Sequence, residues 1–171
     1  MAELTPKERL QPSLLDRLTD DAPSETKEAR EARVLSARQL RRSVLRDLVW
    51  LFNTGNLGAE GDLDGYPLVR QSVLNYGLPE LSGRSVVSMT PKALEGIIRQ
   101  AILDFEPRIL RESLRVRAVI LPDQMNRNAV GFEIHGVLWG QPVPTQLFLR
   151  SEIDLETGHV SVLDSASGAE G

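Results

Sequence analysis

The chain has 171 residues, of which 41% are hydrophobic and 26% charged, a composition typical of one soluble globular domain with tails. It contains no cysteine, which excludes disulfides, thiolate catalysis and zinc–thiolate sites. The net charge of −4 argues against a nucleic-acid-binding protein, because such domains present a basic face to the phosphates.

Residues 1–29 form a polar N-terminal extension with three prolines, and they lack the basic start and apolar run of a signal peptide. No stretch of the chain reaches the roughly 20 apolar residues that span a bilayer. We therefore expect a cytoplasmic protein without direct membrane insertion.

One apolar cluster interrupts this extension. Leu14, Leu15 and Leu18 have the i, i+1, i+4 spacing of one helical face, and Ser13 precedes them as a capping residue. A helix this short is not stable alone in water. The leucines must therefore dock on their own domain or on a partner, and the sequence leaves both possibilities open.

Residues 28–53 carry the first long helical pattern, with an apolar stripe that runs from Val34 to Phe52. Arg38, Arg42 and Arg46 recur at i, i+4 and so share one face of this helix. The face is either an ordinary solvated surface or a basic stripe that binds an acidic protein partner.

The middle of the chain is predicted to contain a glycine-rich, acidic loop at residues 54–66 and then a short helix from Pro67 to Asn75. Gly77 suits a left-handed cap for that helix. A second long helix begins at Thr90, with a hydroxyl at the N-cap and proline after it, and its apolar face ends at Phe105.

Beyond residue 107 the hydrophobic period shortens from 3.6 to 2, which predicts strands. Four are expected, around residues 114–118, 130–139, 147–153 and 160–163, with a tight turn before the last. Helices followed by strands indicate an α+β fold, with N-terminal helices packed on a C-terminal, mainly antiparallel sheet. The expected organisation is an extension at 1–29, one domain at 30–163 and a flexible tail at 164–171.

The tripeptide Glu106-Pro107-Arg108 follows the second long helix directly. Proline stops the helix there, and the two flanking charges lie at the edge of the core, where each needs a partner. One interpretation is a salt bridge within the chain. The other is a rigid kink that presents a carboxylate and a guanidinium to another subunit.

Catalytic and cofactor patterns are absent from the sequence. The two histidines, His135 and His159, lie in a predicted strand and at a predicted turn, and neither has metal-ligand spacing. There is no phosphate-binding loop and no dinucleotide fingerprint. We predict no catalytic residue, no cofactor and no metal site.

Four motifs resemble the TssE family of type VI secretion baseplate subunits. They lie at residues 10–18, 43–54 and 72–79 and at Glu106-Pro107-Arg108, and the last is similar to a signature of phage baseplate wedge proteins called lysozyme-like. The resemblance spans about residues 10–163, and it implies a structural subunit of a contractile injection machine.

This resemblance also implies partners. The family assembles with the wedge proteins TssF, TssG and TssK and meets the sheath proteins TssB and TssC, at the cytoplasmic face of the inner membrane. It places Glu106 and Arg108 at the wedge contact, and it implies that the C-terminal strands imitate sheath subunits and nucleate the sheath. The strands around residues 147–155 and 159–163 are the candidates, because an unpaired edge can template another strand.

Two other functions remain as alternatives. A muramidase would need a second carboxylate beside Glu106. If Arg108 lies close to Glu106, it would also lower the pKa of the Glu106 carboxyl, which a general acid needs raised. A generic protein-interaction adaptor would need no secretion partner at all.

Overall fold

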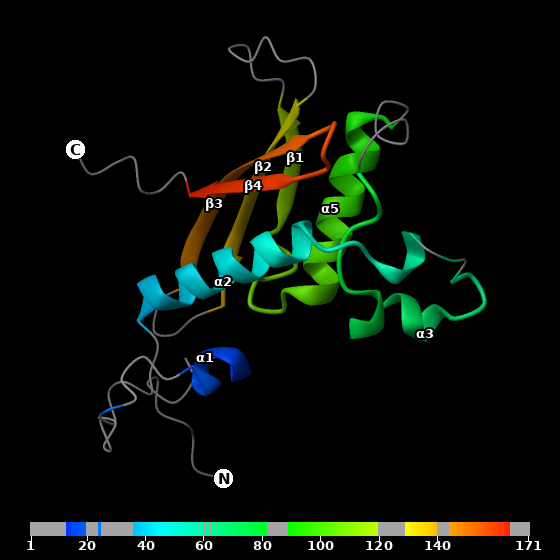
Figure 1. The fold of residues 1–171 in the computed structure, drawn as a ribbon. Coiled ribbons are helices and arrows are strands. Elements are labelled where there is room, and N and C mark those ends of the chain that lie inside the picture. Colours follow the sequence, from blue (N-terminus) through cyan, green and yellow to red (C-terminus); the bar gives the residue numbers. More distant parts are fainter. Residues whose placement is uncertain are drawn as a thin grey trace.

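The computed structural model describes residues 13–19, 24, 36–59, 61, 63–81, 89–119, 129–139 and 144–164. Its helices are α1 (Leu14–Leu18), α2 (Ala37–Phe52), α3 (Pro67–Arg70) and α5 (Pro91–Phe105), with 3-10 turns η3 (Leu57–Ala59) and η4 (Val73–Asn75). The strands are β1 (Arg115–Val119), β2 (Ala129–Leu138), β3 (Thr145–Asp154) and β4 (Val160–Asp164) (Figure 1). The predicted α+β fold, with helices before an antiparallel sheet, is confirmed.

Both long helices begin at side-chain caps. Ser36 and Gln39 form a reciprocal capping box at the start of α2, with the Gln39 N–H donating to the Ser36 hydroxyl over 3.2 Å. The earlier part of the predicted first helix, residues 28–35, lies outside the described residues. Helix α5 begins as predicted, because the Thr90 hydroxyl accepts the Ala93 N–H and Pro91 follows the cap.

The four strands form a meander in the order β1-β2-β3-β4, with every neighbouring pair antiparallel. Strands β2 and β3 pair along their full lengths, whereas β4 pairs only with residues 149–153 of β3. Strand β4 includes Asp164, the residue at which the predicted tail begins, and residues 165–171 lie outside the described part of the chain.

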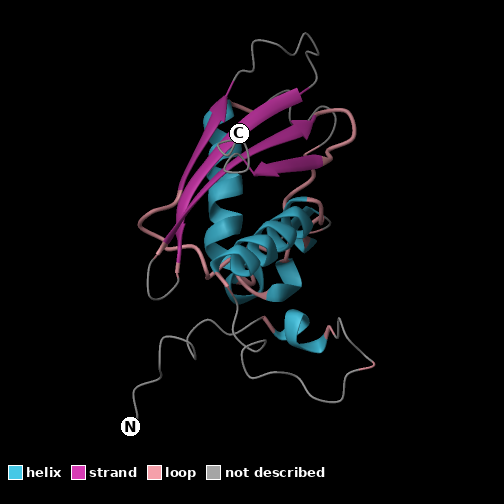
Figure 2. Cartoon of the chain, turned by 90° about the vertical axis from the view of Figure 1, so that its left-hand side faces the viewer, coloured by secondary structure: helices cyan, strands magenta, loops and turns pink. Residues whose placement is uncertain are grey.

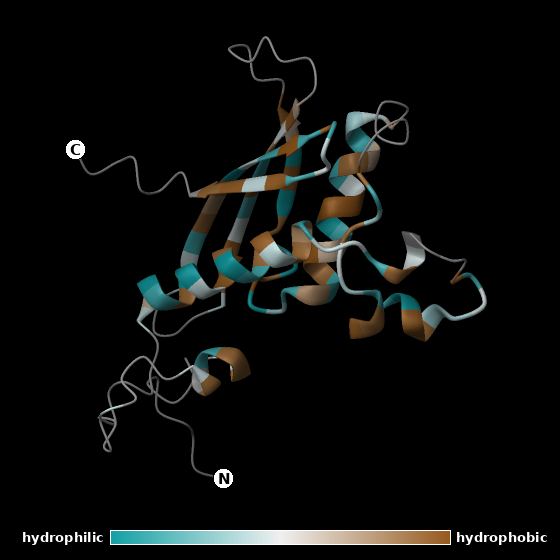
Figure 3. Ribbon diagram, viewed as in Figure 1, coloured by the Kyte–Doolittle hydropathy of each residue, from teal (hydrophilic) through white to brown (hydrophobic). Residues whose placement is uncertain are grey.

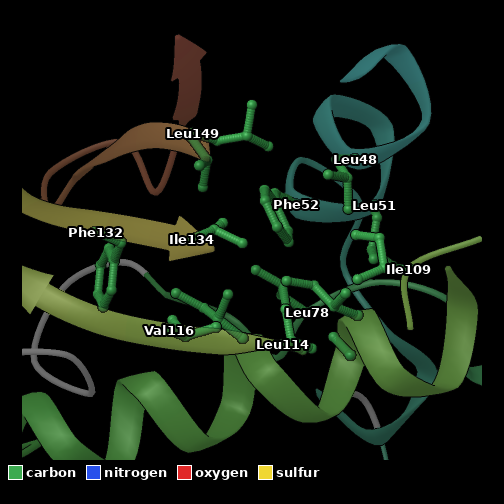
Figure 4. Packing of buried hydrophobic residues seen from close by; sticks show 14 of the residues in the cluster. Leu48, Leu51, Phe52, Leu78, Ile109, Leu114, Val116, Phe132, Ile134 and Leu149 are labelled. Carbon is green, nitrogen blue, oxygen red and sulfur yellow. The ribbon is translucent and has the colours of Figure 1, made fainter. Parts of the chain in front are cut away.

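One face of the sheet and both long helices enclose the core. The sheet contributes Phe132 and Ile134 from β2 and Leu149 from β3, all at most 1% exposed. Helix α2 packs on the β4 side and α5 on the β1 side of this face (Figure 2). Figure 4 shows Leu48 and Phe52 of α2 pointing toward these strand residues. None of the described helices is long and apolar enough to cross a membrane.

Gly77 ties the middle loops to the end of α2. Its φ of 121° is in the left-handed range, as the sequence predicted. The single helix expected from Pro67 to Asn75 is wrong, because α3 and η4 are separate elements and Tyr76 caps the second one. The turn lets the Leu78 N–H donate to the Thr54 carbonyl (2.8 Å) and the Asn56 N–H donate to the Leu78 carbonyl (2.9 Å). A Cβ at position 77 would lie 2.2 Å from the Thr54 oxygen, so only glycine fits.

Candidate functional site

The Glu106-Pro107-Arg108 segment turns the chain from the end of α5 back toward α2. The Glu106 side chain is only 3% exposed, and its carboxylate accepts hydrogen bonds from the backbone N–H (3.2 Å), Nε (2.7 Å) and Nη2 of Arg108. The two residues form a bidentate ion pair within the chain, as the intramolecular interpretation expected. The other interpretation, in which the kink presents both charged groups to another subunit, is wrong for the orientation of Glu106, because its carboxylate is buried. A contact of Glu106 or Arg108 with another subunit stays a prediction.

Arg108 also reaches α2. Its Nη1 donates to the Ser43 hydroxyl over 2.9 Å, and its Nη2 donates to Asp47 Oδ2 over 2.6 Å. Burial by itself would lower the pKa of Arg108, but the bonds with Glu106 and Asp47 outweigh burial and raise it above the ordinary value. The guanidinium therefore stays charged and fixes α2 to the turn after α5.

A second guanidinium continues this arrangement toward the N-terminus. Arg46 donates through Nε to Asp47 Oδ1 (2.9 Å) and through Nη1 to Asp16 of α1. Asp16 also accepts the hydroxyl protons of Ser13 (2.6 Å) and Ser43 (2.8 Å). Burial would raise the pKa of Asp16, but the bonds from Arg46, Ser13 and Ser43 hold it well below its usual value.

These contacts form one connected cluster, which we call the polar hub. Three carboxylates against two guanidiniums give it a net charge of −1. The Tyr76 hydroxyl, from the third motif, donates to the Asp47 carbonyl beside it (3.3 Å). All four motifs that indicated the family therefore meet here in space, although they are far apart in sequence. The hub consists of Ser13, Asp16, Ser43, Arg46, Asp47, Glu106 and Arg108.

The hub holds α1 by its polar side, and the leucines face away. Leu14, Leu15 and Leu18 are 70%, 44% and 73% exposed, and Figure 3 shows the hydrophobic residues on the α1 ribbon. The sequence had left open whether these leucines dock within the chain or on a partner. In the described structure α1 is anchored through Asp16 instead, and the leucines remain at the surface.

The predicted basic stripe on α2 divides into two parts. Arg46 forms ion pairs with Asp16 and Asp47 of the hub, and its guanidinium also lies 5.1 Å from the centre of the Trp50 ring. Arg38 and Arg42 are exposed and form no ion pair with any described residue. Binding of an acidic partner by this stripe stays a prediction.

A fourth arginine of α2, which the sequence pattern did not single out, lies against strand β3. Arg41 donates through Nη1 to the Gln146 carbonyl (2.7 Å) and through Nη2 to the Phe148 carbonyl (3.4 Å) of β3. At the other end of α2, the Asn53 side chain accepts the Val160 N–H (2.9 Å) and donates to the Val160 carbonyl (2.8 Å). The Asn53 side-chain amide thus pairs with the backbone of Val160, the first residue of β4, as the backbone of a neighbouring strand would.

The opposite edge of the sheet is covered as well. Glu95 of α5 accepts the backbone N–H of Ala118 in β1 over 2.8 Å. Asn53, the C-cap of α2, and Glu95 of α5 therefore bind backbone groups of the two outer strands, a common protection against unwanted strand pairing. No sequence signal marked Arg41 or Glu95, and Asn53 appeared only as a member of the motif at residues 43–54. The strand contacts of all three were not predicted, because each side chain acts on a strand that lies far away in the chain.

The remaining sequence candidates do not gather into a reactive site. His135 and His159 are both exposed, and the His135 ring packs at a tilt against Phe148 with ring centres 4.4 Å apart. Among the described residues there is no group of three or more metal-ligating side chains. Both oxygens of Glu106, the one acid considered for a muramidase, are bonded to Arg108.

Comparison with protein families identifies the family to which the chain is similar. A family model described as "Baseplate wedge protein gp25" matches residues 38–143, which is more than half of the chain. The matched region begins in α2 and includes Ser43, Asp47, Glu106 and Arg108 of the hub. A search of curated proteins found no match.

Proposed function

Because the chain belongs to the gp25 family of baseplate wedge proteins, we propose that it is the TssE-type baseplate subunit of a bacterial type VI secretion system. Its role is structural and not catalytic. It binds the wedge proteins TssF, TssG and TssK and starts the TssB–TssC sheath at the cytoplasmic side of the inner membrane. The observation that carries this proposal is the polar hub, where all four family motifs meet.

The hub suggests how the Glu106-Pro107-Arg108 signature serves assembly. Glu106 fixes Arg108, Arg108 fixes Ser43 and Asp47 on α2, and these residues with Arg46 hold Asp16. The signature then acts by orienting α1. In this proposal Glu106 itself remains buried, and Arg108, with 23% of its side chain exposed, is the member that a wedge subunit can approach.

The exposed leucines of α1 are the proposed anchor for the wedge. Each leucine side chain that becomes fully buried contributes about 1.5–3 kcal/mol, and a helix already held at a fixed angle loses less entropy on binding than a free one. Arg38 and Arg42 lie on the following helix, and they supply the charge for an acidic partner surface.

The experiment is co-purification with TssF and TssG from the same host. Replacing Leu14 and Leu18 by serine is expected to abolish recovery of the wedge proteins, whereas replacing both by methionine, which keeps the apolar area, is expected to preserve it. Equal recovery with the serine and methionine variants would rule out the leucine anchor. Failure of the unaltered chain to recover either wedge protein would rule out the baseplate assignment.

A peptidoglycan-clearing assay tests the non-catalytic role separately. We expect no turnover by the unaltered chain, because Arg108 holds the Glu106 carboxylate on both oxygens. Turnover that disappears in Glu106→Gln would replace the structural role with a muramidase.

A further inference from the structure

The segment at residues 108–110 extends the sheet at the end of β2. The Trp139 N–H donates to the Arg108 carbonyl over 2.7 Å. One residue further along the segment, Ile109 lies opposite Leu138 in an antiparallel bridge. The segment is therefore fixed to β2 by its backbone and to α2 by the Arg108 guanidinium.

This pairing places Arg108 and Trp139 opposite one another, on the side that faces away from the core. Side chains of a strand alternate between its two faces, and directly opposite residues share a face. Ile109 and Leu138 are 3% and 0% exposed, so that pair points into the core. The pair beside it points outward, and Trp139 is 46% exposed. A tryptophan at the surface thus lies next to the arginine of the family signature.

The Arg108 guanidinium has little hydrogen-bonding capacity left for a partner. An arginine side chain has five N–H groups, and four of those of Arg108 already donate to Glu106, Asp47 and Ser43. The three carboxylates of the hub outnumber its two guanidiniums, which disfavours an acidic partner side chain at this point. A partner therefore meets mainly the planar face of the guanidinium, and such faces stack on aromatic rings.

The Trp139 side chain is not engaged within the part of the chain that the structure describes. No hydrogen bond, ion pair or ring contact among the described residues involves it, whereas the Trp50 ring lies beside the Arg46 guanidinium. The next outward pair along the segment consists of Leu110 and Val137, which are both half-buried. The surface around the indole is thus apolar on the side of β2.

We propose that Trp139 is the anchor of an apolar contact with a wedge subunit, which packs an aliphatic or aromatic side chain on the indole and on the face of Arg108. The inference rests on the proposed function, because it specifies the chemistry of the contact between the signature and the wedge. Tryptophan and arginine are enriched among the residues that carry most of the binding energy of interfaces. The backbone pairing with β2 also fixes Trp139 before binding, which lowers the entropy lost in the complex.

The small size of this surface argues against a dimer of the chain as its occupant. A stable interface buries roughly 800 Å² on each partner, and one indole with two half-buried neighbours supplies far less. The contact is therefore one part of a larger interface, to which the exposed leucines of α1 add the remaining apolar area.

Trp139→Ala tests the anchor through the affinity for the TssF–TssG complex of the same host. We expect binding to be at least about 30-fold weaker than that of the unaltered chain, the loss typical of an interface anchor. Trp139→Phe keeps an aromatic ring and should lose less than about fivefold. Tyr66→Ala is the control, because Tyr66 is a 65% exposed aromatic residue at the start of α3, outside the hub. Equal affinity of the Trp139→Ala and Tyr66→Ala variants overturns the anchor.

Salt separates an apolar contact from an ionic one. The screening length falls from about 10 Å at 0.1 M to about 3 Å at 1 M salt, so an ionic contact weakens over this range. We expect the ratio of the dissociation constants of Trp139→Ala and the unaltered chain to stay constant within about twofold. A ratio that falls toward one at about 1 M salt overturns the apolar partner.

Hydroxyl-radical footprinting of the unaltered chain provides a test that does not depend on how the variants fold. Trp139 should be modified readily in the free chain and at least about fivefold more slowly in the TssF–TssG complex, because interface anchors are desolvated. A complex that forms without protection of Trp139 overturns the inference and leaves the wedge assignment intact. If the unaltered chain binds neither TssF nor TssG, the proposed function itself fails.

Discussion

Removing Glu106 provides the sharpest test of the polar hub. In Glu106→Ala the Arg108 guanidinium loses the carboxylate to which it donates two hydrogen bonds, and the Arg108 backbone N–H loses its acceptor. The guanidinium remains against Ser43 and Asp47, with 23% of the side chain exposed. Breaking a buried ion pair by removing one partner costs about 3–5 kcal/mol. For a domain of this size, 3 kcal/mol lowers the melting temperature by roughly 6–12 °C.

The measurement is thermal and urea unfolding of Glu106→Ala, Arg108→Ala and the double variant. Arg108→Ala should cost as much or more, because it leaves a carboxylate that is 3% exposed without its counter-charge. The double variant should lose clearly less than the sum of the single losses, because both remove the same interaction. Additive losses, or single losses below about 1 kcal/mol, would refute the hub as the connection between α5 and α2.

The same variants separate stability from assembly. If the signature acts by orienting α1, wedge binding should also fall in Asp16→Asn, which removes a hub charge from α1 and leaves Glu106 and Arg108 in place. Wedge binding that is lost in Arg108→Ala but retained in Asp16→Asn would instead indicate direct recognition of Arg108 by the partner.

The other predictions concern a turn, a helix and pH. Gly77→Ala should destabilise the chain by about 3 kcal/mol, because the added Cβ meets the Thr54 carbonyl at 2.2 Å and φ is 121°. Gly96→Ala, at an open position within α5, should stabilise it by about 0.5–1 kcal/mol in the same unfolding assay. Because folding lowers the pKa of Asp16, its contribution is complete above about pH 4, the unfolded value, and falls as acid protonates the folded carboxyl. Trp50 fluorescence should report release of the neighbouring Arg46 in acid, and Asp16→Asn should remove that transition. A transition unchanged in Asp16→Asn would assign it to another group.

The position of α1 illustrates where reasoning from sequence stops. The spacing of its leucines predicts an amphipathic turn, and amphipathic turns ordinarily bury their apolar side. Here one carboxylate reverses the orientation, because Asp16 finds Arg46 and Ser43 on α2 and turns the leucines outward. The strength of that attachment depends on residues about 30 positions away, which no local pattern contains.

The sequence by itself determined the two long helices, the strands and their α+β arrangement, because hydrophobic period, proline and capping residues act within a few positions of the chain. The sequence also identified the family, because its motifs can be recognised without knowing where they lie in the fold. Only the tertiary structure decided which charges meet, that Glu106 is buried, and that Arg41 and Asn53 bind the backbones of β3 and β4. Those outcomes depend on side chains brought together from segments up to 107 residues apart, and a one-dimensional pattern does not encode such distances.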